Sequence, residues 1–544
     1  MNIQHIVRTP ARPAGRACFL LVLLYTLAQA IPALAGVAGP PGGKPAAPAA
    51  TAILDAHQLA ARLYAEGPPP RWLDDGQAQA RVALRLLANA AEHGLDPSLY
   101  GAADLARRLD QLSGPAAGAA FERDLSTAML QFLTDLHFGR TVPDYRPQPS
   151  ATAGFDPVAC LRQAVQDSSL AEAVEAAAPA IPIYRRVKAT LAQYRALSRA
   201  DPDWPPLPAA PGATGIAAGD AYEAAGLLRE RLRLLGDLDA AAEADGGIYT
   251  PELARAVRRF QARHGLSEDG VLGPDTLAAL AVPPAQRVAQ LELTLERLRW
   301  LPPPPRGRFI VVNVPAYRLW AFDGSGDPSV AALEMRVIVG TAARTPTPLF
   351  IGEMRYLEFN PYWNVPRSIE TGEIIPKLAR DPAYLERNDM ELVSGSGQVL
   401  RGAAGDALAA LRAGSARVRQ RPGPLNVLGQ VKFAMPNPMN IYLHSTAAQA
   451  LFGRTRRDLS HGCIRVEHPA ELAQFVLADP QAWNADAVAA AMHGGRTRTV
   501  ALRQTVPVLL FYATAITDRQ GRALFANDIY RRDAALIRAL HGSR

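Results

Sequence analysis

The spacing of apolar residues changes once along this chain, from a helical period to a strand period, and this change limits the fold class. From Ala52 to about Ala200, apolar residues recur every three to four positions, as in Glu122–His137, which predicts amphipathic helices. After the prolines at 302–305, short apolar stretches such as Phe309–Val314 predict β-strands. We therefore expect an α+β multidomain protein, with helical parts first and a β-rich part after them.

The N-terminus has the pattern of an export signal. Arginines precede an apolar run at 17–27, and an Ala-Leu-Ala sequence at 33–35 is a small-residue cleavage site. The apolar run is shorter than the roughly 20 residues that a membrane-spanning helix needs. We expect a signal peptide at 1–35 and a flexible linker of Gly, Pro and Ala at 36–51. The alternative is a signal retained as a membrane anchor.

Cysteine usage and charge exclude two classes of protein. After removal of the signal, Cys160 and Cys463 remain of three cysteines, so this exported chain is not a disulfide scaffold. We expect Cys463 to be free and Cys160 to be a buried, inert thiol. The formal net charge is +7, and no basic stripe with interleaved aromatic residues is present, which argues against a nucleic-acid partner.

Proline-rich breaks divide the helical part into two units, a scaffold domain at 52–210 and a smaller unit at 221–282. In the smaller unit, Thr250 followed by Pro251 predicts a helix start, with Thr as the N-cap. The sequence at 254–280 resembles the three-helix peptidoglycan-binding module. The alternative is a helical hairpin that only spaces the neighbouring domains.

Within the β-rich part, the strand pattern lapses between Pro366 and about Pro424. The segment 368–387 is helix-like and carries apolar residues that can anchor it. A loop of this length inside a domain is usually functional or disordered. We expect a folded, helical capping insertion at 366–424 that covers a substrate cleft.

The residues with the most chemistry lie in the sequence SHGCIR at 460–465, with His444 nineteen residues before the cysteine. A free thiol is only a few per cent ionised at neutral pH, so a nucleophilic cysteine needs a base. A histidine can take the proton and return it to a leaving amine. Cys463 is the candidate nucleophile, His444 the candidate base, and backbone N–H groups around His461 and Gly462 are candidate oxyanion donors.

Two alternatives to a catalytic pair remain. A lone cysteine or histidine is more often a satisfied core residue than a catalyst. A metal site of His444, His461, Cys463 and His468 is the other alternative, although zinc ligands usually occur in tight pairs that this spacing lacks.

Residues 441–469 (IYLHSTAAQALFGRTRRDLSHGCIRVEHP) resemble the catalytic signature of the YkuD-type L,D-transpeptidases. The segments 360–366, 421–429 and 518–533 resemble landmarks of the large YcbB-like subgroup. The resemblance implies a catalytic domain at 307–500, a scaffold-associated segment at 501–544 and a periplasmic location.

The resemblance also implies a reaction on peptidoglycan stem peptides. Cys463 would attack the carbonyl between meso-diaminopimelate and the terminal D-alanine, and a second stem would resolve the thioester into a 3→3 cross-link. No metal or organic cofactor is expected, other cell-wall synthesis proteins are possible partners, and carbapenems would acylate the thiol. The alternatives are an L,D-endopeptidase or amidase of the same fold and a non-catalytic cell-wall-binding scaffold.

Several roles near the motif are implied by the same resemblance. The backbone carbonyl of Ser445 would orient the base, although relatives often carry Asp at this position. Arg465 would hold a substrate carboxylate, or else form a salt bridge with Glu467. The remaining predicted substrate-binding residues are Tyr442, Ser460 and Trp363.

Overall fold

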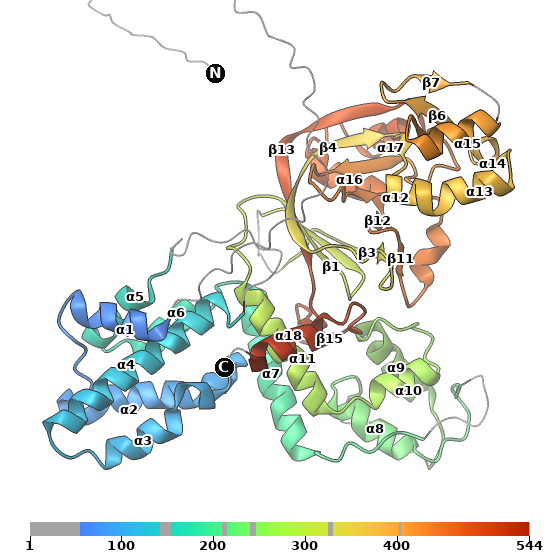
Figure 1. The fold of residues 1–544 in the computed structure, drawn as a ribbon. Coiled ribbons are helices and arrows are strands. Elements are labelled where there is room, and N and C mark those ends of the chain that lie inside the picture. Colours follow the sequence, from blue (N-terminus) through green and yellow to red (C-terminus); the bar gives the residue numbers. More distant parts are fainter. Residues whose placement is uncertain are drawn as a thin grey trace, which may run out of the picture. The chain divides into compact units, whose positions relative to one another are not determined.

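The computed structural model describes residues 55–141, 154–208, 215–239, 246–324, 330–401 and 404–542 (Figure 1). The predicted signal peptide at 1–35 and linker at 36–51 lie outside these residues. In the part described, no helix combines the length and the apolar character needed to cross a membrane.

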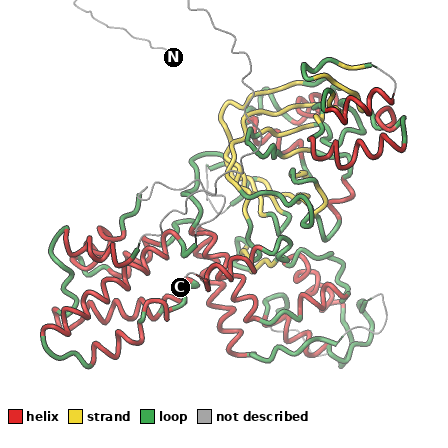
Figure 2. Tube along the Cα trace, viewed as in Figure 1, coloured by secondary structure: helices red, strands yellow, loops and turns green. Residues whose placement is uncertain are grey.

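Residues 55–141 and 154–208 are mainly helical, as the periodicity predicted (Figure 2). The longest helix, α4 (Pro115–Phe138), contains the predicted amphipathic segment and buries Phe121, Leu125 and Met129. These side chains share one apolar core with α11 (Pro284–Arg299). The other helices are α1 (Ala56–Ala65), α2 (Asp74–Ala88), α3 (Ala102–Asp110), α5 (Pro157–Gln166), α6 (Leu170–Ala177) and α7 (Pro182–Ala200).

The smaller helical unit contains α8 (Ala225–Leu234), α9 (Pro251–Arg263) and α10 (Pro274–Leu280). The predicted helix start is confirmed, because the Thr250 hydroxyl accepts a hydrogen bond from the backbone N–H of Leu253. The buried side chain of Gln261 accepts a hydrogen bond from the Gly270 N–H at 2.8 Å. This bond fixes the turn between α9 and α10.

A sheet of nine strands forms the β-rich domain, in the order β11-β3-β12-β10-β9-β4-β13-β1-β2. Because β2 also pairs with β3, the sheet closes on itself. One face packs an apolar core with α16 (Pro469–Leu477) and α17 (Ala485–His493). The strands are β1 (Phe309–Asn313), β2 (Arg318–Phe322), β3 (Leu333–Gly340), β4 (Phe350–Phe359), β9 (Val431–Ala434), β10 (Leu443–His444), β11 (Asp458–Ser460), β12 (Ile464–Val466) and β13 (Arg498–Phe511).

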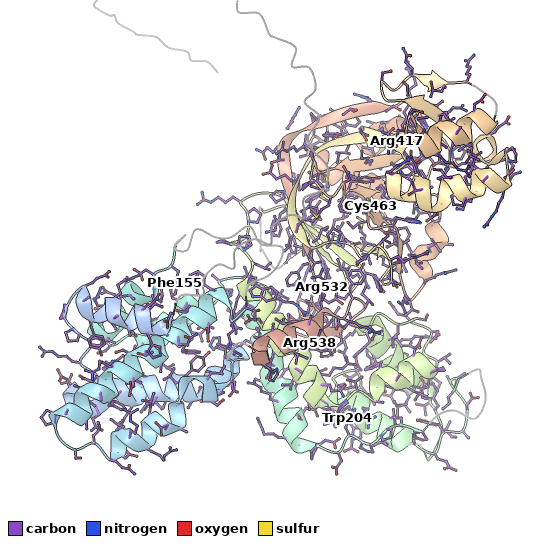
Figure 3. All side chains as sticks on the ribbon, viewed as in Figure 1. Phe155, Trp204, Arg417, Cys463, Arg532 and Arg538 are labelled. Carbon is purple, nitrogen blue, oxygen red and sulfur yellow. The ribbon has the colours of Figure 1, made fainter. Side chains whose placement is uncertain are left out.

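The insertion at 366–424 contains helices, as predicted, but it also contains a sheet that was not predicted. Strand β8 (Ala416–Gln420) buries Ala416 and Val418, while Arg417, labelled in Figure 3, is exposed. The alternation of buried and exposed residues covers only five residues of a segment rich in arginine and alanine, so the sequence did not indicate a strand there. The sheet order is β5-β8-β6-β7, with β5 (Trp363–Asn364), β6 (Met390–Ser394) and β7 (Val399–Leu400). The helices are α12 (Arg367–Ile369), the π-helical turn η3 (Glu370–Ile374), α13 (Ile375–Arg380), α14 (Tyr384–Arg387) and α15 (Ala404–Ala413).

The catalytic sheet extends beyond the predicted boundary at 500, because β13 pairs with β1 up to Phe511. The chain then forms a hairpin of β14 (Ala515–Thr517) and β15 (Ala523–Phe525), followed by α18 (Arg532–Gly542). The hydroxyl of Thr294 on α11 donates to the Ala515 carbonyl at 2.7 Å, and Arg297 pairs with Asp533 at 2.6 Å. Phe511 and Ala513 also belong to the apolar core of the helical part, so the end of the sheet and the segment predicted to associate with the scaffold overlap.

Candidate active site

Strand alternation brings the motif residues onto one face of the sheet. In the β10–β12 pair, Leu443 lies opposite Ile464 and His444 opposite Arg465. Leu443 and Ile464 are fully buried in the core, so their neighbours point to the other face. Cys463, labelled in Figure 3, precedes Ile464 and therefore lies on the same face as His444. The structure therefore gathers the two predicted catalytic residues beside Arg465.

Cys463 ends a turn that hydroxyl groups hold in place. Gly462 has φ +114°, a conformation that a side chain would strain. Ser460 Oγ donates to the Cys463 carbonyl at 2.6 Å and accepts from the Gly462 N–H at 3.1 Å. Thr347 Oγ1 donates to the Gly462 carbonyl at 2.7 Å. Ser460, predicted to bind substrate, is buried, and its hydroxyl positions the turn.

These contacts reduce the number of backbone N–H groups that are candidates for the predicted oxyanion hole. The Gly462 N–H already donates to the hydroxyl of Ser460. The backbone N–H of Cys463 has no acceptor among the residues that the structure describes. An oxyanion donor must be free to point at the position where negative charge develops. The N–H of Cys463 is therefore the better candidate in this conformation.

The thiol of Cys463 is half-buried and protonated. Its Sγ lies 3.6 Å from the carbonyl oxygen of Asn440, and the Tyr442 hydroxyl is a second hydrogen-bonding partner. Burial raises the pKa of the thiol, and the Tyr442 contacts and the charges of Lys432 and Arg465 oppose this rise only in part. At neutral pH the free protein therefore holds a thiol and not a thiolate.

His444 is a buried, neutral imidazole, only 4% exposed. Its Nδ1 lies 2.6 Å from the carbonyl oxygen of Ser445. Because a carbonyl can only accept, the ring proton is on Nδ1, and the Leu428 backbone is a second hydrogen-bonding partner of the ring. Burial lowers the pKa of His444 to about 3, with a further lowering from the positive charge of Arg465. The ring is therefore neutral at physiological pH, which is the form in which a histidine can act as a base.

The predicted contact between Cys463 and His444 is not formed in this structure. No hydrogen bond joins the thiol to the imidazole within the described ranges, because the Sγ is directed at the Asn440 carbonyl. Catalytic hydrogen bonds are often long or misaligned without substrate and shorten when it binds. The thiol must leave Asn440 before His444 can take its proton.

Arg465 has no ion pair in the part of the chain that the structure describes. The alternative salt bridge with Glu467 is not formed, because Arg336 Nε holds that carboxylate at 2.8 Å. Arg465 is half-buried, and its Nε is buried without a hydrogen-bond partner. A buried guanidinium is costly unless it is paired. This environment favours the other expectation, a substrate carboxylate at Arg465.

Ser445 contributes its backbone and its side chain in different ways. Its carbonyl accepts the hydrogen bond from His444. Its buried hydroxyl accepts from the N–H groups of Gln430 at 2.7 Å and Val431 at 3.1 Å, and donates to the Leu428 carbonyl at 3.1 Å. The side chain, predicted to bind substrate, thus holds the chain before β9.

We expect replacement of Ser445 by alanine to lower the free energy of unfolding by about 3 kcal/mol, because two buried N–H groups lose their acceptor. Thermal unfolding of the variant measures the loss. Ser267→Ala is the matched control, since its exposed hydroxyl contacts only Thr455 at 3.1 Å. Equal unfolding midpoints for the two variants would contradict this prediction.

The capping insertion and Trp363, which lies just before it, contact two neighbours of Cys463, namely His461 and Tyr442. His461 Nε2 lies 2.7 Å from Glu373 Oε1 in η3, and this contact lowers the pKa of Glu373. Trp363, at the base of the insertion, is buried and hydrogen-bonds the Tyr442 hydroxyl. The side chain of His461, predicted near the oxyanion hole, thus joins the cysteine turn to the insertion. Trp363 is a core residue as well as a neighbour of the site.

We expect Glu373→Gln to raise the rate at which iodoacetamide alkylates Cys463 by up to about fivefold. The His461–Glu373 pair is partly exposed, and such pairs contribute at most about 1 kcal/mol, which limits the effect. Mass spectrometry of the labelled thiol measures the rate. Glu353→Gln is the control, because Glu353 pairs with exposed Arg355 on β4. An alkylation rate equal to that of this control would show that the contact does not restrain the insertion.

Four residues of the site were not predicted: Asn440, Lys432, Thr347 and Glu373. Lys432 pairs with Glu358 at 2.8 Å and lies 4.9 Å from the Tyr442 ring centre. The sequence Thr-Pro-Thr-Pro at 345–348 was the available signal for Thr347. The other three are recognisable only from the folded chain.

The two described cysteines form no disulfide, and the candidate metal ligands do not form a group of three among the described residues. Cys160, expected to be buried, is half-buried on α5, and burial raises its pKa. Both cysteines are free. Throughout the described ranges, no three His, Cys, Asp or Glu side chains are grouped as metal ligands, and His468 lies beside Glu467 and Glu471.

The helical scaffold, the three-helix unit and the β-rich domain with its cysteine–histidine site define a multidomain protein with an enzyme domain. Residues 307–500 match the family model of the YkuD L,D-transpeptidase catalytic domain. Residues 58–191 match a "Scaffold domain", and residues 222–280 match a "Putative peptidoglycan binding domain". The β-rich part of the chain is therefore similar to the YkuD L,D-transpeptidase catalytic domain over residues 307–500.

A curated protein of Haemophilus influenzae, described as "Putative L,D-transpeptidase", is 34% identical over 244 residues. That match covers 45% of this chain and 48% of the relative, so it spans about half of the relative's length. A solved L,D-transpeptidase from Xylanimonas cellulosilytica is 16% identical, covering 56% of this chain and all of that one, with a TM-score of 0.18. One from Stackebrandtia nassauensis is 14% identical, covering 57% and 100%, with a TM-score of 0.23. With TM-scores this low, the family assignment rests on the sequence matches.

Proposed function

We propose that this protein is a periplasmic L,D-transpeptidase that forms 3→3 cross-links between peptidoglycan tetrapeptide stems. The family of residues 307–500 supports a transpeptidase. The observation that carries the proposal is one sheet face with a thiol, a neutral imidazole and an unpaired guanidinium, at Cys463, His444 and Arg465. The export pattern at 1–35 and the cell-wall family support a location outside the cytosol.

In the first step, Cys463 Sγ attacks the carbonyl carbon between meso-diaminopimelate and the terminal D-alanine. His444 Nε2 accepts the thiol proton and passes it to the leaving nitrogen, so that a C–S bond replaces the C–N bond and D-alanine departs. The Cys463 N–H donates to the oxyanion, a contribution typically worth about 3 kcal/mol. Arg465 holds a carboxylate of the donor stem.

In the second step, a side-chain amine of another stem attacks the thioester carbon. His444 takes the amine proton and returns it to the leaving sulfur, which restores the thiol. Neither step uses a metal or an organic cofactor. A carbapenem carbonyl is expected to acylate Cys463 in the same way as the donor stem.

Incubation with disaccharide-tetrapeptide, followed by mass spectrometry, tests the proposal. A cross-linked dimer together with free D-alanine supports the transpeptidase. Tripeptide without dimer identifies the hydrolytic alternative, in which water replaces the acceptor amine. An unchanged substrate that still binds to the protein identifies the non-catalytic scaffold.

A further inference from the structure

A cavity of about 1000 Å³ lies where three parts of the chain meet. Its walls come from α9 and α10 of the three-helix unit, from α11, and from β2, β3 and the loop at 453–457 of the catalytic domain. Cys463 and His444 are not among its lining residues. The cavity is therefore distinct from the thiol site.

One wall carries Arg457, which is buried without a counter-ion. The residue is 6% exposed, and its Nε has no hydrogen-bond partner. Its Nη1 donates only to the carbonyl of Arg454 at 2.6 Å, and the guanidinium lies 5.1 Å from the Tyr317 ring centre. Burial lowers the pKa of Arg457 to about 10, and the nearby charges of Arg318 and Arg336 act in the same direction.

The opposite helix, α11, carries a second such cation, Arg287. This residue is 9% exposed and donates to two neutral acceptors, Gln290 Oε1 at 2.9 Å and the Ala279 carbonyl at 3.1 Å. Its guanidinium lies 4.4 Å from the Phe525 ring centre. Burial lowers the pKa of Arg287 to about 10. No carboxylate pairs with Arg287 or Arg457 in the part of the chain described.

The acidic residues that line the cavity do not neutralise these two arginines. Asp528 accepts from the Tyr512 hydroxyl at 2.6 Å and from the backbone N–H of Arg532 at 2.8 Å. Glu268 and Asp275 are exposed. Removing two cations from water without a counter-ion costs free energy, which a bound anion would offset.

We propose that this cavity binds carboxylates of peptidoglycan stem peptides and so anchors a glycan strand while Cys463 reacts. The inference rests on the proposed function, which it deepens. Guanidinium groups are suited to carboxylates, since they donate two parallel hydrogen bonds. The cavity also joins the two parts of the chain whose families are described by peptidoglycan binding and by transpeptidation. Stem peptides carry several free carboxylates, which matches two separate cations.

Binding of soluble, un-cross-linked glycan strands that carry tetrapeptide stems tests this proposal. The measurements use the full exported chain with Cys463→Ala, so that no strand is consumed, and isothermal titration calorimetry gives the Kd. Adding Arg457→Gln or Arg287→Gln is expected to weaken binding about tenfold. Arg71→Gln, which removes a 79% exposed arginine from the scaffold, is the matched control and is expected to bind as the parent does. The same strands with their carboxylates amidated are expected to bind at least tenfold more weakly.

Equal binding of native and amidated strands would overturn the proposal, and so would affinities of the Arg457 and Arg287 variants equal to that of Arg71→Gln. If either variant unfolds, the amidated strands decide with the parent protein that also carries Arg465→Gln, because that protein lacks the guanidinium proposed to hold a stem carboxylate at the thiol site. Binding at the thiol site is common to the Arg457 and Arg287 variants and does not depend on those two arginines. Failure of the proposed function is separate, because it appears as absence of D-alanine release by the protein with Cys463 intact.

Discussion

Replacing Cys463 by alanine is expected to abolish release of D-alanine from disaccharide-tetrapeptide, a loss of at least about a thousandfold. The thioester requires the sulfur, and the Ser460 hydroxyl in the same turn is buried and donates to the Cys463 carbonyl. The fold is expected to survive, because the thiol is half-buried and its contacts are with the Asn440 carbonyl and the Tyr442 hydroxyl. Enzymatic detection of free D-alanine measures the loss, and circular dichroism checks the fold.

Cys160→Ala is the matched control for this experiment. Cys160 is the other free cysteine, lies on α5 of the scaffold and is also half-buried. We expect this variant to release D-alanine at the parent rate. Retained release by Cys463→Ala, or an equal loss in both variants, would exclude the thioester mechanism.

The sequence was sufficient for the parts of the site that depend on local order along the chain. Side chains alternate between the two faces of a strand, so the neighbours of Leu443 and of Ile464 point away from the core. When the two short strands pair in this register, His444 and Cys463 therefore lie on one face. The φ of +114° at Gly462 likewise follows from a glycine in a tight turn. Pattern and local chemistry therefore fixed the nucleophile and the base as candidates.

Contacts that depend on strand register or on a distant segment were not predictable in the same way. A pair between Arg465 and Glu467 was reasonable, because residues two apart share a strand face. In the sheet, however, the Glu467 N–H bonds the carbonyl of Arg336 on β3, and the Arg336 guanidinium takes the Glu467 carboxylate. The contact of His461 with Glu373 joins residues 88 positions apart, so it follows only from how the insertion folds.

Replacing His444 by glutamine is expected to slow acylation of Cys463 by about 100-fold to 10,000-fold, the usual contribution of a positioned general base. Glutamine is similar in size and polar, but its amide cannot accept the thiol proton. The resting thiol has a raised pKa, so the reaction depends on a base more than it would with a preformed thiolate. The rate at which a carbapenem acylates Cys463, followed by mass spectrometry of the protein, measures this effect.

The same variant has an expected effect on stability that depends on pH. The pKa of His444 is lowered to about 3 in the folded protein, whereas an unfolded histidine titrates near 6.5. The unfolded chain therefore binds the proton first, and the stability present above about pH 6.5 is lost as the pH falls towards 3. The free energy of unfolding lost in this way amounts to about 5 kcal/mol once the pH is below 3. His444→Gln is expected to remove it, so that unfolding midpoints decline less steeply between pH 6.5 and pH 3.

His93→Gln separates the two effects, because His93 is also buried, with its pKa lowered to about 3, but lies in the scaffold beside Tyr184 and Lys188. We expect this control to flatten the acid dependence of stability as His444→Gln does, yet to acylate at the parent rate. Parent-like acylation by His444→Gln would show that another group takes the thiol proton. An acid dependence of His444→Gln equal to that of the parent would show that folding does not lower the pKa of His444.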